Sequence, residues 1–199
     1  MEGPHMTHTA LTRRQFLASA TAASLALPAR AQDDWLMPEA FTPRVVEFVD
    51  PQLPGSIIVD PEYFELYFAS TSVRAVQYTV GIGKGDLYEY GRFTVGAKKR
   101  WPSWTPTQDM IARNPDQYAR YADGMPGGPG NPLGSRALYL FDDQGADTFL
   151  RIHGTPEPWT IGQAVSNGCV RLANEHIEML YDAVEVGAEV ILMPRFDQV

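Results

Sequence analysis

The 199-residue sequence predicts one mainly β domain, a sandwich or a small barrel, with a few short helices. Three observations favour this class. Segments with strand patterns recur about seven times along the chain. The 17 glycines and 16 prolines are more than a helical bundle would carry and suit strands joined by turns and irregular loops. Helical patterns occur in only two places, while 44% of the residues are hydrophobic, which is enough for one ordinary core.

The N-terminal end has the pattern of an export signal. Residues 1–5 resemble an expression scar, and Arg13-Arg14 is followed by Phe and Leu, as in a twin-arginine (Tat) signal. A mildly apolar run over 16–27, too short to span a membrane permanently, leads to an A-x-A cleavage site ending at Ala31. We therefore expect the Tat machinery to export the protein, residues 1–31 to be removed, and no permanent membrane anchor to remain.

The net charge and the cysteine content exclude one class of partner and one kind of cross-link. The chain has 16 Lys and Arg against 24 Asp and Glu, and loss of the signal leaves 13 against 23, a formal charge of −10. Because phosphate attracts basic surfaces, such a protein is not expected to bind nucleic acid non-specifically. Cys169 is the only cysteine, so no internal disulfide can form.

The mature chain opens with a Pro-containing, acidic and extended lead-in at residues 32–55, and we place the folded domain at 56–195. Apolar runs and period-two alternation mark the strands within it. The predicted strands span residues 56–60, 64–69, 76–82, 92–95, 137–141, 148–153 and 190–193.

Two short helices are predicted within residues 105–121. Thr105 and Asn114 each precede a proline and begin a capping pattern, so both are predicted N-caps. A last helix is predicted over 174–184, with Asn174 able to cap it.

A long loop is predicted over residues 124–135, which contain five glycines and three prolines. It follows Trp101 and Trp104, so it is either a binding loop or lid, or a passive crossing of the surface.

The chemistry-bearing residues gather near Cys169. Once the signal is removed, only His153 and His176 supply an imidazole. A cysteine nucleophile needs a base within hydrogen-bond reach, and an imidazolium beside it would lower the pKa of the thiol. His153 ends a predicted strand on the face opposite the apolar row, so we expect it in an exposed cleft. Gly168, just before Cys169, would let backbone N–H groups approach an oxyanion.

The run His153-Gly154-Thr155, then Gly162, then Ser166-x-Gly168-Cys169-x-Arg171, resembles the catalytic signature of the L,D-transpeptidases, the YkuD-like domain. Cys169 follows His153 by sixteen positions. The resemblance implies a β-sandwich of mixed sheets with a few short appended helices. One departure is His176, where members of the family often carry Asp.

The resemblance also implies a reaction. Cys169 would attack the peptidoglycan stem peptide between its third residue, usually diaminopimelate, and the terminal D-Ala, and an acceptor amine would resolve the thioester. His153 would act as base and then acid, with its ring oriented by the carbonyl of Gly154 or of its neighbour. Gly168 and Cys169 would hold the oxyanion. Residues assigned to shaping the pocket or contacting substrate are Ser166, Asn167, Arg171 and Thr155.

The resemblance also implies the partners, the cellular compartment and the inhibitors of the protein. Peptidoglycan stem peptides are the expected partners, the periplasm is the expected compartment, and carbapenems should react with the thiol. No cofactor and no metal are expected.

Other enzyme classes fit less well. Residues 164–168 imitate the nucleophile elbow of serine hydrolases, but only His176 follows, whereas that fold needs an acid and then a histidine well downstream. An S-x-x-K motif, as in penicillin-binding enzymes, is absent from the sequence, and so are the H-E-x-x-H and H-x-x-E-H zinc motifs. An L,D-carboxypeptidase that transfers to water and a non-catalytic wall-binding module stay open as alternatives.

Overall fold

The computed structural model describes residues 35–198. The predicted signal segment, residues 1–31, lies outside this part of the chain. None of the helices between residues 35 and 198 combines the length and the apolar character that a membrane span requires.

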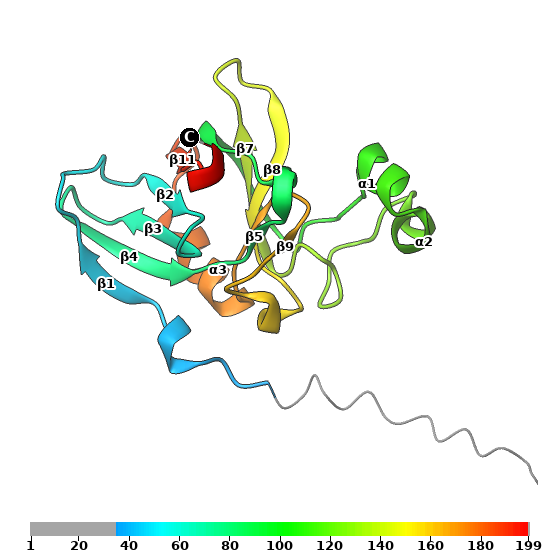
Figure 1. The fold of residues 1–199 in the computed structure, drawn as a ribbon, viewed down its shortest axis with the longest axis horizontal. Helices are drawn as coiled ribbons and strands as arrows, with labels where there is room; N and C mark the ends of the chain where they lie inside the picture. Colours follow the sequence, from blue (N-terminus) through cyan, green and yellow to red (C-terminus); the bar gives the residue numbers. More distant parts are fainter. Residues whose placement is uncertain (1–34, 199) are drawn as a thin grey trace, which may run out of the picture. The chain divides into compact units, whose positions relative to one another are not determined.

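The mainly β class is confirmed. Within the described residues, nine strands form one mixed sheet and two short strands form a second sheet (Figure 1). In sheet order the nine are β1 (Arg44–Glu47), β4 (Arg74–Thr79), β3 (Glu65–Ala69), β2 (Ile57–Asp60), β11 (Glu189–Leu192), β6 (Gly91–Arg100), β7 (Arg136–Phe141), β8 (Asp147–His153) and β10 (Val170–Arg171). The two-stranded sheet pairs β5 (Ile82–Gly83) with β9 (Ala164–Ser166).

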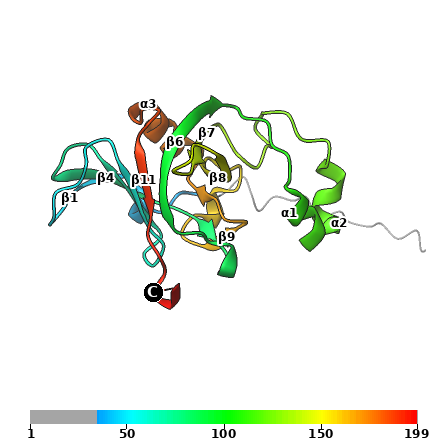
Figure 2. The same cartoon turned by 90° about the horizontal axis from the view of Figure 1, so that it is seen from above.

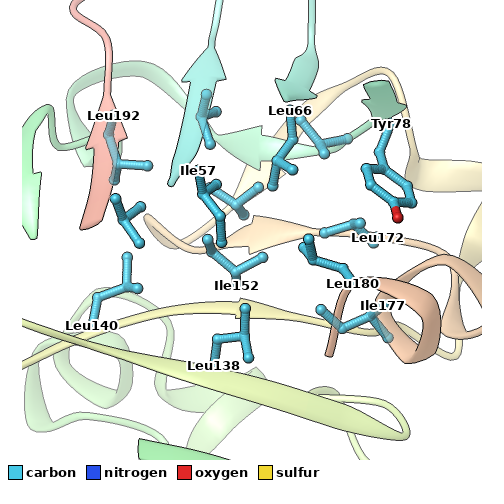
Figure 3. Packing of buried hydrophobic residues seen from close by; sticks show 14 of the residues in the cluster. Ile57, Leu66, Tyr78, Leu138, Leu140, Ile152, Leu172, Ile177, Leu180 and Leu192 are labelled. Carbon is cyan, nitrogen blue, oxygen red and sulfur yellow. The ribbon is translucent and has the colours of Figure 1, made fainter. Parts of the chain in front are cut away.

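The two layers of the sandwich are halves of the one large sheet. β11 and β6 connect the half made of β1–β4 to the half made of β7, β8 and β10. Both halves contribute to one core: Ile57 and Leu66 come from the first half, and Leu138 and Leu140 approach from the second (Figure 3). Each such side chain contributes about 1.5–3 kcal/mol when fully buried.

One helix closes this core. α3 (Asn174–Ala183) packs against β7 and β8, and its buried Ile177 and Leu180 lie beside Leu172 in the cluster (Figure 3). The predicted helix over 174–184 is confirmed. Because Leu172 directly follows β10, the same packing anchors the strand that carries the end of the sequence motif.

The strand predictions were right in position and incomplete in extent. β1 lies inside the predicted lead-in and pairs with the edge of β4, where Glu47 faces Arg74. The single predicted strand over 76–82 is split, since Val80 and Gly81 separate β4 from β5. β6 continues to Arg100 beyond the predicted end at 95, and β9 and β10 were missed because three and two residues carry no readable period.

The helices α1 (Gln108–Arg113) and α2 (Pro115–Tyr118) confirm the two predicted within 105–121. Asn114 caps α2 as predicted. Thr107, and not Thr105, caps α1, because its hydroxyl accepts from the N–H of Met110. Both helices lie at the end of the fold away from β1–β4 (Figure 2). Short 3-10 turns occur at Glu39–Phe41, Gly85–Leu87, Ala119–Tyr121, Pro158–Thr160 and Phe196–Gln198.

Asn174 does not cap its helix as predicted. Ala173 occupies the N-cap position, and the Oδ1 atom of Asn174 accepts from the backbone N–H of Ser135 at 2.9 Å. The carboxamide lies against the backbone of Gly134 and Gly154, where a Cβ atom on either glycine would overlap it. Asn174 therefore ties the start of β7 to the end of β8 and to α3.

Replacing Asn174 with Ala should destabilise the fold by about 1–3 kcal/mol, because the N–H of the buried Ser135 would lose its acceptor. Chemical denaturation of the mature protein measures this free energy of unfolding. The exposed Met179 on the same helix is the control, and Met179→Ala should change stability by less than about 0.5 kcal/mol. Equal stability of both variants would contradict the bridging role of Asn174.

Candidate active site

Cys169 lies at the start of the strand that pairs with the end of β8. β8 ends at His153, and β10 begins directly after Cys169. In their parallel register Arg171 lies opposite His153, so these two side chains share one face of the sheet. Cys169 therefore directly precedes the short ladder in which β10 pairs with the end of β8.

The imidazole of His153 is oriented by the next residue. Its Nδ1 atom lies 2.5 Å from the carbonyl oxygen of Gly154. Because a carbonyl oxygen only accepts, Nδ1 carries the proton, and Nε2 of the neutral ring keeps a free lone pair. Gly154 is needed for this geometry, since a Cβ atom there would overlap Oδ1 of Asn174. The basic atom of His153 is therefore Nε2.

Burial keeps this ring neutral. His153 is 3% exposed, so the expectation of an exposed cleft was wrong. Burial, and then the positive charge of Arg171, lower the pKa of His153 to about 3, although the hydrogen bond to Gly154 acts to raise it. At neutral pH the ring is therefore uncharged, and Nε2 is unprotonated.

The thiol of Cys169 is also neutral in the free protein. Burial raises its pKa, and the opposing effects of the Arg151 N–H and of the Arg151 and Arg171 charges do not cancel this. Among the described residues, Sγ has no hydrogen bond to His153, and it lies 3.9 Å from the carbonyl oxygen of Phe149. The expectation of an imidazolium that lowers the thiol pKa is therefore wrong for the resting state.

Ser166 and Gly168 shape the turn that leads to Cys169. The hydroxyl of Ser166 donates to the carbonyl oxygen of Cys169 at 2.6 Å and accepts from the N–H of Gly168 at 3.2 Å. Gly168 has a φ of 120°, and a Cβ atom there would lie 2.9 Å from the oxygen of Leu87. Ser166 thus braces the turn, and the N–H of Gly168 is already occupied.

Asn167 is held by the two short helices. Its Nδ2 donates to the hydroxyl of Tyr118 at 2.9 Å, and its Oδ1 accepts from Arg113 at 3.3 Å. Tyr118 also packs edge-on against Trp104, at 6.2 Å between ring centroids. The segment that precedes the predicted loop is thereby joined to the turn beside the nucleophile, a contact the sequence did not predict.

Arg171 and Thr155 organise the loop after β8. Arg171 lies 3.5 Å from the carboxylate of Glu157 and 3.4 Å from the hydroxyl of Thr160. Thr155 is buried, and its hydroxyl accepts from the N–H of Glu157 at 3.0 Å. Both side chains are engaged within the protein.

Arg151 is the site residue that sequence reasoning overlooked. It makes two contacts with the carboxylate of Asp147, at 2.7 and 2.8 Å, and its guanidinium stacks 4.0 Å from the centroid of Tyr139. Period-two alternation already placed it on the face of His153, and only its contacts were beyond sequence reasoning. Like Arg171, which lies beside Glu157, it is matched by a carboxylate of the protein.

His176 stands apart from this group. Its ring is buried, its pKa is lowered by burial, and its Nδ1 atom has no hydrogen-bond partner among the described residues. Its centroid lies 6.1 Å from that of Tyr78. Elsewhere in residues 35–198 we find no group of three or more His, Cys, Asp or Glu side chains arranged to hold a metal ion.

The family model of the L,D-transpeptidase catalytic domain, YkuD, matches residues 54–192. The chain belongs to this family. Among its relatives are two Escherichia coli proteins, Probable L,D-transpeptidase YbiS, 35% identical over 138 residues, and Probable L,D-transpeptidase ErfK/SrfK, 33% identical over 146 residues. They match 68% and 70% of this chain, which covers only 43% and 44% of their own lengths.

A solved structure from Brucella melitensis is 48% identical. It is named a probable carnitine operon oxidoreductase caia, has a TM-score of 0.54, and aligns over 79% of this chain and 96% of its own. This L,D-transpeptidase family member therefore has a structural relative whose name refers to another activity.

The buried His153 makes stability depend on pH. In the unfolded chain the imidazole takes up a proton as the pH falls through about 6.5, whereas in the fold it does so only near 3. The free energy of unfolding therefore decreases with falling pH over this interval, by about 1.4 kcal/mol per unit for each such proton. His153→Gln should lower the slope by nearly that amount around pH 5.

Denaturant unfolding of the mature protein at a series of pH values between 5 and 8 measures this slope. His176, whose pKa is also lowered, contributes in the same direction, so some slope should remain in His153→Gln. A slope identical to that of the wild type would show that His153 is not held neutral by the fold.

Proposed function

We propose that this protein is an L,D-transpeptidase of the bacterial cell wall that uses Cys169 as its nucleophile. One observation carries the proposal: in a domain of this family, Cys169 directly precedes β10, which pairs with the end of β8, where the neutral His153 keeps an unprotonated Nε2. A thiol and a neutral base on adjacent segments are what covalent acyl transfer needs.

In the first half of the reaction, Sγ of Cys169 attacks the carbonyl carbon of the third stem residue as Nε2 of His153 takes the thiol proton. The imidazolium that forms remains hydrogen-bonded to the Gly154 carbonyl. It then gives the proton to the amide nitrogen of D-Ala, the C–N bond of the tetrahedral adduct breaks, and D-Ala leaves as the thioester forms. In the second half, Nε2 accepts a proton from the acceptor amine as the amine nitrogen attacks the thioester carbon. The C–S bond then breaks, and the imidazolium returns the proton to Sγ, which regenerates the thiol.

The surrounding residues support this chemistry in different ways. The N–H of Gly168 is bound to Ser166, so we assign the oxyanion to the N–H of Cys169 and leave the turn of Ser166 and Gly168 to position it. Asn167 and Arg171, with Thr155, shape the walls of the site through their contacts within the protein.

The natural substrate would be a tetrapeptide stem with diaminopimelate at its third position, reached in the periplasm. We keep residues 56–195 as the catalytic domain, preceded by a lead-in at 32–55 that supplies β1. Residues 1–31, outside the described part, would be the tag scar and the Tat signal. We assign the role of a lid over the donor to residues 101–135, because Tyr118 in this segment binds Asn167 beside the nucleophile.

Transfer to water would make the protein an L,D-carboxypeptidase with the same residues, and this is the main alternative. A non-catalytic wall-binding module would not need a thiol and a neutral imidazole together. The residues described at this site favour acyl transfer over the oxidoreductase activity for which the Brucella melitensis protein is named.

Mature protein, residues 32–199, incubated with purified muropeptides should convert tetrapeptide stems into tripeptides or cross-linked dimers, because both products follow from the same thioester. Mass spectrometry of the muropeptides measures the conversion. Cys169→Ala should lose at least about a thousandfold in rate, since nucleophilic catalysis is removed. As a matched readout, a carbapenem should add one drug mass to the wild type and none to Cys169→Ala.

Unchanged stems after prolonged incubation with folded protein would support the binding-module alternative. An adduct that persists in Cys169→Ala would place the nucleophile elsewhere, with Ser166 the first residue to test.

The export proposal has its own test. Replacing Arg13 and Arg14 together with Lys should leave the precursor in the cytoplasm, because the arginine pair is the address that the Tat receptor recognises. Cell fractionation measures this, and the unaltered precursor is the control. A double variant that still reaches the periplasm would assign export to the general secretory route.

A further inference from the structure

Phe149 has a backbone conformation that its side chain disfavours. Its φ is 63°, in the left-handed region that favours glycine, and it lies within β8, four residues before His153. Its ring is 69% exposed. Burial of the ring therefore does not offset the backbone strain, so stability alone gives no reason for a phenylalanine here.

Several contacts hold this conformation. The N–H of Phe149 donates to the carboxylate of Asp147 at 2.9 Å, and the same carboxylate binds Arg151. The pairing of β8 with β7 shifts between Tyr139 and Phe141, which marks a bulge. Bulges next to functional sites commonly change the direction of a side chain. Here the regular pairing of β8 with β7 is interrupted around Phe149, whose carbonyl oxygen lies near Sγ of Cys169.

The bulge places Phe149 beside the reacting sulfur. Its carbonyl oxygen lies 3.9 Å from Sγ of Cys169, and its ring centroid lies 5.9 Å from the guanidinium carbon of Arg151. Glycine would adopt the same backbone without strain and still offer the carbonyl. What phenylalanine adds is an exposed apolar ring on the residue whose carbonyl oxygen lies near Sγ.

We propose that the ring of Phe149 is a specificity-determining contact for the acyl donor. Resting on the proposed function, the inference is that the ring packs against the hydrocarbon part of the third stem residue, whose carbonyl carbon Sγ attacks. That residue is joined to Sγ in the thioester, so its side chain begins within a few bonds of the sulfur. A diamino acid presents a run of methylenes there, and an aromatic face shields methylenes from water.

The test compares two synthetic stem tetrapeptides that end in D-Ala, one with a diamino acid and one with L-Ala as the third residue. The wild type should prefer the diamino donor in kcat/KM. In Phe149→Gly this preference should fall about tenfold, as expected when two or three methylenes lose their apolar contact. Phe149→Tyr keeps the ring and should keep the preference, and the Tm of Phe149→Gly should not fall, because glycine relieves the strained φ.

The outcomes separate the two proposals. An active wild type whose preference is unchanged in Phe149→Gly overturns the role of the ring alone, and so does an equal loss with both donors. A folded wild type that converts neither donor overturns the proposed function and this inference with it. A collapsed preference in Phe149→Gly that Phe149→Tyr retains supports the inference.

Discussion

The parallel pairing of β8 with β10 is the contact on which the site depends. It is only two residue pairs long, yet it holds the segment that follows Cys169 against the strand end that carries His153. A ladder this short is not stable by itself. It is stabilised by the core beneath it, where Leu172 and α3 pack on β7 and β8. The hydrophobic core thus fixes the geometry of the reacting groups.

Close backbone packing then determines the proton positions. Gly154 lies against Asn174, with no room for a side chain, and its carbonyl oxygen accepts a hydrogen bond from Nδ1–H of His153. Burial disfavours both the imidazolium and the thiolate, so the pair rests uncharged. In the proposed mechanism, proton transfer therefore accompanies attack on the substrate, and the resting thiol is less reactive than a permanent thiolate.

Local pattern predicted most of the fold and the family to which the chain belongs. Alternation found the central strands, the apolar face of α3 was evident, and the spacing from His153 to Cys169 indicated the family. Features that depend on contacts between distant parts of the sequence could not be predicted in this way. β10 is too short for a period, Asn174 binds a backbone 39 residues away, and the burial of His153 depends on segments that pack over it. For that reason the structure lowers the pKa of His153 and keeps its ring neutral, whereas the sequence predicted an imidazolium.

The same distinction explains why Phe149 drew no attention in the sequence. A phenylalanine in a strand is ordinary, and only the structure places it at a left-handed φ with its ring in solvent. Strain of this kind persists where surrounding contacts over-determine it, here Asp147 and the shifted pairing with β7. A rigid strand carrying His153 and a strained residue beside Sγ can position base and substrate together, whereas a flexible loop would lose that precision.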